Sequence, residues 1–106
     1  MNFENQTALI TGAARGIGKT IAIKLAECGA DLALLDMSND FDEVSRKVKS
    51  LGRKCLTFQS DVTDFENVVD NLKNITEKQG DIHILVNNAG ITKDELFMRM
   101  KLEQWE

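Results

Sequence analysis

Apolar residues occur along the chain either in short continuous runs or in stretches where they recur every three or four positions. The short runs predict four strands, at Thr7–Ile10, Leu32–Leu35, Cys55–Phe58 and Ile82–Val86. Because these runs are continuous rather than alternating, we expect the strands to be covered on both faces, as in a parallel sheet between helices. The stretches between them carry a helical period, and Gly29, Gly52 and Gly80 mark the predicted helix ends.

Each predicted helix has an apolar face that we expect to pack on the sheet. The first face comprises Ile17, Ile21, Leu25 and Cys28, the second Phe41, Val44, Val48 and Leu51, and the third Phe65, Val68, Val69, Leu72 and Ile75. Thr63 and Glu66 have the spacing of a capping box at the start of the third helix. The alternation of strand and helix predicts an α/β fold, a Rossmann-like doubly wound parallel sheet truncated after its fourth strand.

The composition of the chain mainly excludes classes of binding partner and location. At 106 residues the chain is expected to form one domain, and its 17 acidic and 13 basic residues give a net charge of −4. That balance predicts no binding to nucleic acid or to an anionic membrane, and no apolar run approaches the length of a membrane span. The N-terminus lacks a signal-peptide pattern, and Cys28 and Cys55 form no CxxC pair, so we expect free thiols, a cytoplasmic location and no metal site.

The strongest candidate for chemistry is the turn after the first predicted strand, where Gly12, Gly16 and Gly18 form a GxxxGxG pattern. Glycine lacks a Cβ, so the turn can be tight and a pyrophosphate can approach the backbone. The predicted helix that begins near Gly16 would present free N–H groups and its positive dipole end to that anion. An ordinary glycine-rich turn is the alternative, but the position between a strand and a helix favours dinucleotide binding.

Asp36 ends the second predicted strand, 18 residues after Gly18. A carboxylate there can accept hydrogen bonds from both hydroxyls of an adenosine ribose and would repel a 2′-phosphate, which favours NAD(H). Arg15 in the glycine turn could instead reach a 2′-phosphate, so NADP(H) stays as the alternative cofactor. Met37, the next residue after Asp36, adds no positive charge.

Polar residues also end the third and fourth predicted strands. Asp61 could accept from an adenine amino group while Val62 packs on the ring, or Asp61 could be only a turn residue. The run Asn87–Gly90 could tie strand ends together and touch a cofactor ribose, or it could be a strand-terminating turn. His83, at the opposite edge, is predicted to be structural.

These residues in combination resemble the motif series of the classical short-chain dehydrogenases/reductases. The matching segments are Thr11–Gly18, Asp61–Val62 and Asn87–Gly90. The segment Ile91–Met100 looks like the one that follows the Asn-Asn-Ala-Gly motif in 3-oxoacyl-acyl-carrier-protein reductases. The resemblance covers the whole chain but only the first part of a family member.

The resemblance implies a role for each motif residue. Gly12, Arg15, Gly16, Ile17 and Gly18 would hold the pyrophosphate, with Ala14 of the same turn also at the cofactor. Asp36 and Met37 would lie at the adenosine ribose, Asp61 and Val62 at the adenine, and Asn88, Ala89 and Gly90 near the nicotinamide-side ribose. The family's strand order would be 3-2-1-4.

Family enzymes transfer hydride between a nicotinamide and a substrate carbonyl, with a tyrosine, a lysine and a serine at the reaction centre. This sequence has no tyrosine, so we expect residues 1–106 to be the inactive, N-terminal dinucleotide-binding part of one Rossmann-like domain. The complete enzyme would reduce 3-oxoacyl-acyl-carrier-protein in fatty acid synthesis. The alternatives are a non-catalytic NAD-binding or assembly module, and a piece of another short-chain alcohol or sugar dehydrogenase. The bare edge of the fourth predicted strand predicts self-association, and complete family members are usually tetramers.

Overall fold

A computed structural model describes residues 2–61 and 63–88 and shows strands and helices in strict alternation. The elements are β1 (Thr7–Thr11), α1 (Gly16–Glu27), β2 (Asp31–Asp36), α2 (Asp42–Ser50), β3 (Cys55–Gln59), α3 (Phe65–Gln79) and β4 (Ile82–Asn87). All four predicted strands are present, each extended by one or two residues. The α/β fold class predicted from the sequence is confirmed.

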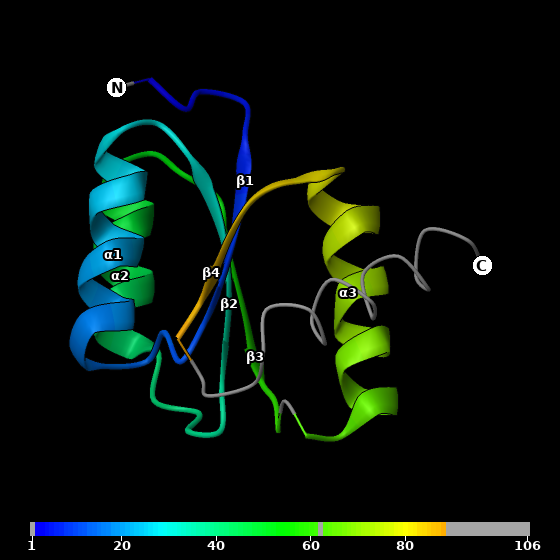
Figure 1. The fold of residues 1–106 in the computed structure, drawn as a ribbon. Helices are drawn as coiled ribbons and strands as arrows, with labels where there is room; N and C mark the ends of the chain where they lie inside the picture. Colours follow the sequence, from blue (N-terminus) through cyan, green and yellow to red (C-terminus); the bar gives the residue numbers. More distant parts are fainter. Residues whose placement is uncertain (1, 62, 89–106) are drawn as a thin grey trace.

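The four strands form one parallel sheet in the order β3-β2-β1-β4. Helices α1 and α2 cover one face of this sheet and α3 covers the other (Figure 1). Because all strands run the same way, their carboxyl ends lie at one edge, where the loops after β1, β2 and β3 begin. This is the doubly wound arrangement in which ligands bind at the carboxyl edge of the sheet.

The central strands explain why their sequences read as continuous apolar runs. All five residues of β1 are buried, and so are the four inner residues of β2. Neighbouring residues point to opposite faces: Ile10 and Leu34 pack toward α1 and α2, whereas Leu9 and Leu35 pack toward α3. Both faces of these strands are therefore buried, and their inner positions, Ala8–Ile10 and Leu32–Leu35, are all apolar.

The predicted face of helix α1 is only partly confirmed: Ile21 and Leu25 are half-buried against the core, but the fully buried face lies beside them. Its buried residues are Gly18, Ala22 and Ala26, whereas Ile17 is 71% exposed. A Cβ on Gly18 would lie 2.1 Å from the carbonyl oxygen of Gly12, a separation that no real side chain tolerates. The small residues let the helix lie close to the sheet, and the larger apolar residues are displaced to its flanks.

The predicted faces of the other helices are largely confirmed. Val44 and Val48 of α2 are buried, whereas Leu51 at its end is 38% exposed. The buried residues of α3 include Val68, Leu72 and Ile75, while Val69 is half-buried. The side chain of Phe65 is outside the described residues.

The predicted capping box at the start of α3 is wrong. Asp64 caps this helix, and its carboxylate accepts a hydrogen bond from the Asn67 N–H at 3.2 Å. The Thr63 hydroxyl donates to Asp61 at 2.6 Å, in the turn that precedes the helix.

His83 lies at the amino end of β4 and has a structural contact there. The pairing of β4 with β1 shifts register at this point, so that Thr7 pairs with Ile82 and Ala8 with Ile84. The N–H of Thr7 donates to Nδ1 of His83 at 3.1 Å, so the imidazole supplies an acceptor beside the irregular pairing. In the described part of the chain, no helix is long and apolar enough to cross a membrane.

Candidate functional site

The loop between β1 and α1 contains the three glycines of the predicted site, each with a distinct structural reason. Gly12 and Gly16 have φ of +66° and +62°, the left-handed region that favours glycine. A Cβ on Gly12 would also lie 2.9 Å from the carbonyl oxygen of Asn88. At Gly16 a Cβ would meet no described atom within 4 Å, so this position faces open space. Close packing thus excludes a side chain at Gly12 and Gly18. At Gly16 the absence of a side chain leaves unfilled space beside the loop.

The first turn of α1 is arranged to receive an anion. Arg15 precedes the helix with an extended backbone, and among the described residues its side chain makes no capping hydrogen bond. The first turn carries no acidic residue. The N–H groups at the start of a helix lack intrahelical partners and lie at the positive end of its dipole. Backbone donors at such a helix start can bind a phosphate.

Hydrogen bonds between β1 and β4 hold the glycine loop from the other side. The Thr11 hydroxyl donates to Oδ1 of Asn87 at 3.1 Å and accepts from the N–H of Asn88 at 2.9 Å. Nδ2 of Asn88 donates to the carbonyl oxygen of Gly12 at 3.4 Å. The expectation that these amides tie strand ends together is confirmed. Ala89 and Gly90 are outside the described residues, and the proximity of Asn88 to a ribose stays a prediction.

Asp36 ends β2 and is half-buried beside the glycine loop. Its Oδ2 accepts a hydrogen bond from the N–H of Ala14 at 3.0 Å, and its Oδ1 accepts one from the N–H of Ser38 at 2.9 Å. The sequence pattern suggested the position of Asp36 but not its contact with Ala14. Met37, the next residue, is 68% exposed.

Asp61 lies exposed after β3 and participates in a turn. Its Oδ1 accepts hydrogen bonds from both the N–H of Thr63, at 2.9 Å, and the Thr63 hydroxyl. The bond from the hydroxyl, followed by that from the N–H, holds the pKa of Asp61 below its ordinary value. Of the two readings that the sequence allowed, the structure supports the turn role. The adenine contact stays a prediction, and Val62 is outside the described residues.

Large apolar side chains are exposed on both sides of this edge. Ile17 and Met37 are the two most exposed large hydrophobic residues in the described part of the chain. Ile17 also lines a shallow hollow of about 440 Å³ along the first turns of α1, with Gly16, Lys19, Thr20 and Ile21. Exposed apolar groups beside free backbone donors suit a ligand with planar rings and a charged centre.

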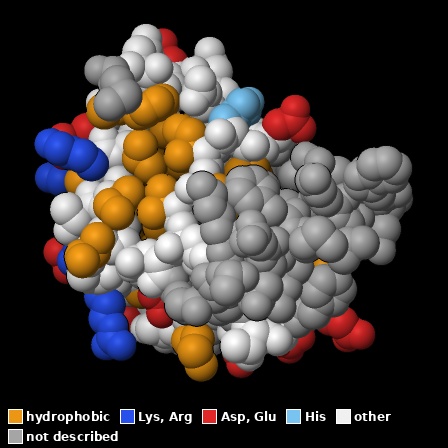
Figure 2. Space-filling view, viewed as in Figure 1, with side chains coloured by type: hydrophobic (Ala, Val, Ile, Leu, Met, Phe, Trp, Pro, Cys, Tyr) orange, Lys and Arg blue, Asp and Glu red, His pale blue; other side chains and the backbone are white. Residues whose placement is uncertain are grey.

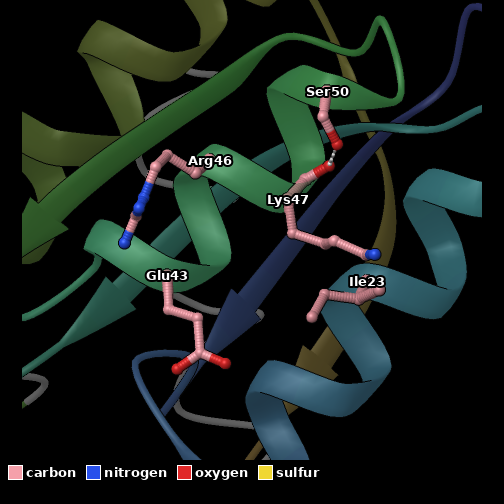
Figure 3. A pocket seen from close by; sticks show the side chains of 5 residues that line it. All are labelled: Ile23, Glu43, Arg46, Lys47 and Ser50. Atoms are coloured by element: carbon pink, nitrogen blue, oxygen red, sulfur yellow. Dashed lines mark hydrogen bonds between the residues drawn. The ribbon is translucent and has the colours of Figure 1, made fainter.

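A second hollow, of about 500 Å³, lies between α1 and α2, away from the motif residues (Figure 3). Lys47 extends from α2 toward Ile23 of α1, and Glu43 and Arg46 line the same hollow. Glu43 pairs with Lys19 at 2.6 Å, and this lysine lowers the pKa of the exposed carboxyl group. Because its lining has charges of both signs and an open surface, this hollow does not indicate a particular class of ligand.

The chain matches a known protein family. The family model described as short chain dehydrogenase matches residues 6–106, so the chain belongs to the short-chain dehydrogenase family. The fold and the glycine-loop geometry fit that assignment.

Individual relatives make the similarity more specific. The chain is 39% identical over 104 residues to the 3-oxoacyl-[acyl-carrier-protein] reductase FabG of Staphylococcus epidermidis, covering 96% of this chain and 43% of that protein. It is 40% identical over 106 residues to the FabG of Buchnera aphidicola, covering 100% of this chain and 43% of the relative. The chain therefore spans less than half the length of these curated relatives.

Solved structures of similar fold include two dehydrogenases with bound NAD. Carveol dehydrogenase from Mycobacterium avium in complex with NAD is 30% identical, with a TM-score of 0.80, over 93% of this chain and 44% of that one. An NAD⁺-bound xylitol dehydrogenase is 34% identical, with a TM-score of 0.80, over 86% of this chain and 35% of that one.

The Asp61 turn predicts a measurable pH effect. Because folding lowers the pKa of Asp61, the turn should stabilise the fold above the carboxyl's unfolded pKa, and this contribution should be lost as the pH falls through the folded pKa. Thr63→Val removes the hydroxyl donor and should raise the pKa of Asp61 toward its ordinary value. NMR titration of the carboxyl carbon measures this shift. Thr57→Val, at an exposed position of β3, is the control, and an unmoved pKa of Asp61 in Thr63→Val would contradict the prediction.

Proposed function

We propose that the carboxyl edge of the sheet binds a nicotinamide dinucleotide, with the diphosphate on the glycine loop and the first turn of α1. The open, left-handed Gly16 at the uncapped start of α1 is the observation that carries this proposal. Gly12 and Gly18 would shape the loop, while Ala14, Arg15 and Ile17 would lie along the ligand. The NAD-bound dehydrogenases of the same fold support this assignment.

The preferred cofactor in this proposal is NAD(H) rather than NADP(H). The half-buried carboxylate of Asp36 has one protein donor on each oxygen, which leaves acceptor capacity for the two ribose hydroxyls. A 2′-phosphate at the same place would meet that negative charge. Met37, Asp61 and Val62 would then lie on the adenosine side of the cofactor, and Asn88, Ala89 and Gly90 on the nicotinamide side.

For the whole protein, we propose hydride transfer to a 3-oxoacyl thioester carried on acyl-carrier protein. Identity of 39–40% to FabG proteins supports this reaction. Residues 1–106 would provide the cofactor-binding part. They include no tyrosine, so they do not supply the acid–base group that the family resemblance implies.

An NAD-dependent alcohol or sugar dehydrogenase is the second candidate. Asp36 favours it, because a carboxylate at this position suits NAD(H). The resemblance to acyl-carrier-protein reductases, many of which use NADPH, implies the other cofactor. The carveol and xylitol dehydrogenases with bound NAD share the fold.

Gly16→Ala tests the proposed cofactor site. The unaltered chain should bind NADH more tightly than NADPH, and Gly16→Ala should weaken NADH binding at least tenfold because its Cβ enters the phosphate space. Gly52→Ala is the matched control: Gly52 has a φ of +79° and the same open surroundings, but it lies after α2. Both variants should lose about 1–2 kcal/mol of stability from backbone strain. Fluorescence titration and urea unfolding measure the two effects, and equal NADH affinity in both variants would refute the site.

The 106-residue chain should bind NADH without catalysing turnover. With acetoacetyl thioester as substrate, oxidation of NADH should stay at the background rate because no tyrosine is present to donate the proton. Absorbance at the nicotinamide band measures the rate. Steady-state reduction above background would show that another residue performs the acid–base step.

We also propose that the 106-residue chain self-associates through β4. Among the described strands, only β1 pairs with β4, so its other edge has no strand partner there. Hydrophobic side chains gather on the face between α1 and β4 (Figure 2). Ile84 and Val86 of β4 are only partly buried, and they pack against the same core cluster as Ile21 and Leu25 of α1. An open strand edge beside apolar surface promotes pairing between chains.

Sedimentation velocity tests this association. Dimers or larger species should increase with concentration, and Ile84→Lys should reduce them because it places a charge on β4. Thr57→Lys, on the exposed side of β3, is the control. A chain that sediments as a monomer at all concentrations would contradict the proposal.

A further inference from the structure

Asp36 connects the loops that follow three strands. Its carboxylate accepts from the N–H of Ala14 at 3.0 Å and from the N–H of Ser38 at 2.9 Å. Its main-chain oxygen accepts from the N–H of Ser60 at 2.7 Å. One residue at the end of β2 therefore contacts the loops after β1, β2 and β3. The dinucleotide is proposed to cross this same edge of the sheet.

Two consecutive amides of the glycine loop are anchored to the end of β2. The N–H of Ala13 donates to the carbonyl oxygen of Leu35 at 3.2 Å, and the next N–H, of Ala14, donates to the Asp36 carboxylate. The exposed residues Arg15 and Gly16 follow directly and lead into α1. The bond to Ala14 is thus the last of these anchors before the helix start, where the diphosphate is proposed to bind.

We propose that Asp36 is a positioning residue for the diphosphate, holding the glycine loop in its open shape in addition to meeting the adenosine ribose. This inference rests on the proposed function. It distinguishes two effects of removing the carboxylate. If Asp36 acts on the ribose alone, a bare diphosphate should bind as well or better once a nearby negative charge is lost. If Asp36 also positions the loop, the bare diphosphate should bind more weakly.

Asp36→Asn separates these effects because it keeps the size of the side chain. Its single carboxamide oxygen cannot replace both carboxylate oxygens as acceptors for Ala14 and Ser38. Asp40→Asn removes the same charge from an exposed residue of the loop after β2 and serves as the control. Each protein is titrated with inorganic pyrophosphate and with NADH, and the amide resonances of residues 12–18 are followed by NMR.

We expect Asp36→Asn to weaken pyrophosphate binding roughly tenfold, as for loss of one charge-assisted hydrogen bond, and NADH binding further. Asp40→Asn should change neither. Resonances of α2 and β3 should stay in place, which distinguishes a local effect on the loop from general unfolding.

Other outcomes are equally decisive. Unchanged or tighter pyrophosphate binding with weaker NADH binding would show that Asp36 serves the ribose alone and would overturn the inference. A response of the unaltered chain to NADH but not to pyrophosphate would also overturn it, because a loop held open must accept the bare diphosphate. No response to either ligand would refute the proposed function itself.

A measurement on the unaltered chain covers the case in which Asp36→Asn fails to fold. Without ligand, the amide hydrogen of Ala14 should exchange with solvent as slowly as that of Ala13, since both are bonded to the end of β2. Exchange of the Ala14 amide at the rate of an unprotected amide would overturn the inference.

Discussion

The close approach of α1 to the end of β1 is the constraint on which the site depends. The helix can occupy this position only because Gly18 has no side chain, since a Cβ there would lie 2.1 Å from the carbonyl oxygen of Gly12. Ala22 and Ala26 continue the same narrow face along the sheet. With the helix this close, the connecting loop must turn within a few residues, which requires left-handed backbone at Gly12 and Gly16. The absence of side chains then leaves backbone donors at an exposed edge.

Polar side chains around this edge secure the loop on two sides. Thr11 and Asn88 bind the loop to β4, and Asp36 binds it to the end of β2. Each of these hydrogen bonds joins a short side chain to a main-chain N–H or carbonyl group, so the loop keeps little conformational freedom. A site whose donors are fixed before the ligand arrives loses less entropy on binding.

The charge distribution is compatible with an anionic ligand even though the chain carries a net charge of −4. Charges more than about 8–10 Å away are largely screened at physiological salt, so the local field at the loop matters most. There the helix start supplies partial positive charge, and Arg15 is exposed beside it. Lys19 is engaged by Glu43 instead. The local positive potential therefore comes from Arg15 together with the backbone at the helix start, and in the proposed site the carboxylate of Asp36 would disfavour a ribose with a 2′-phosphate.

The sequence by itself determined the strand and helix order, the two-sided burial of the strands and the candidate edge, because hydrophobic period and glycine position report local geometry. It placed the centre of the packed face of α1 on Ile21 and Leu25, which lie only at its flank, because periodicity counts large apolar residues, whereas the distance between helix and sheet here selects Gly18 and Ala22. It also misassigned the cap of α3, because Asp64 and Thr63 both have side chains able to cap a helix. Only the tertiary structure decided that Asp36 meets Ala14, 22 residues away in the chain. That contact depends on β1 and β2 lying in register side by side, which no local pattern encodes.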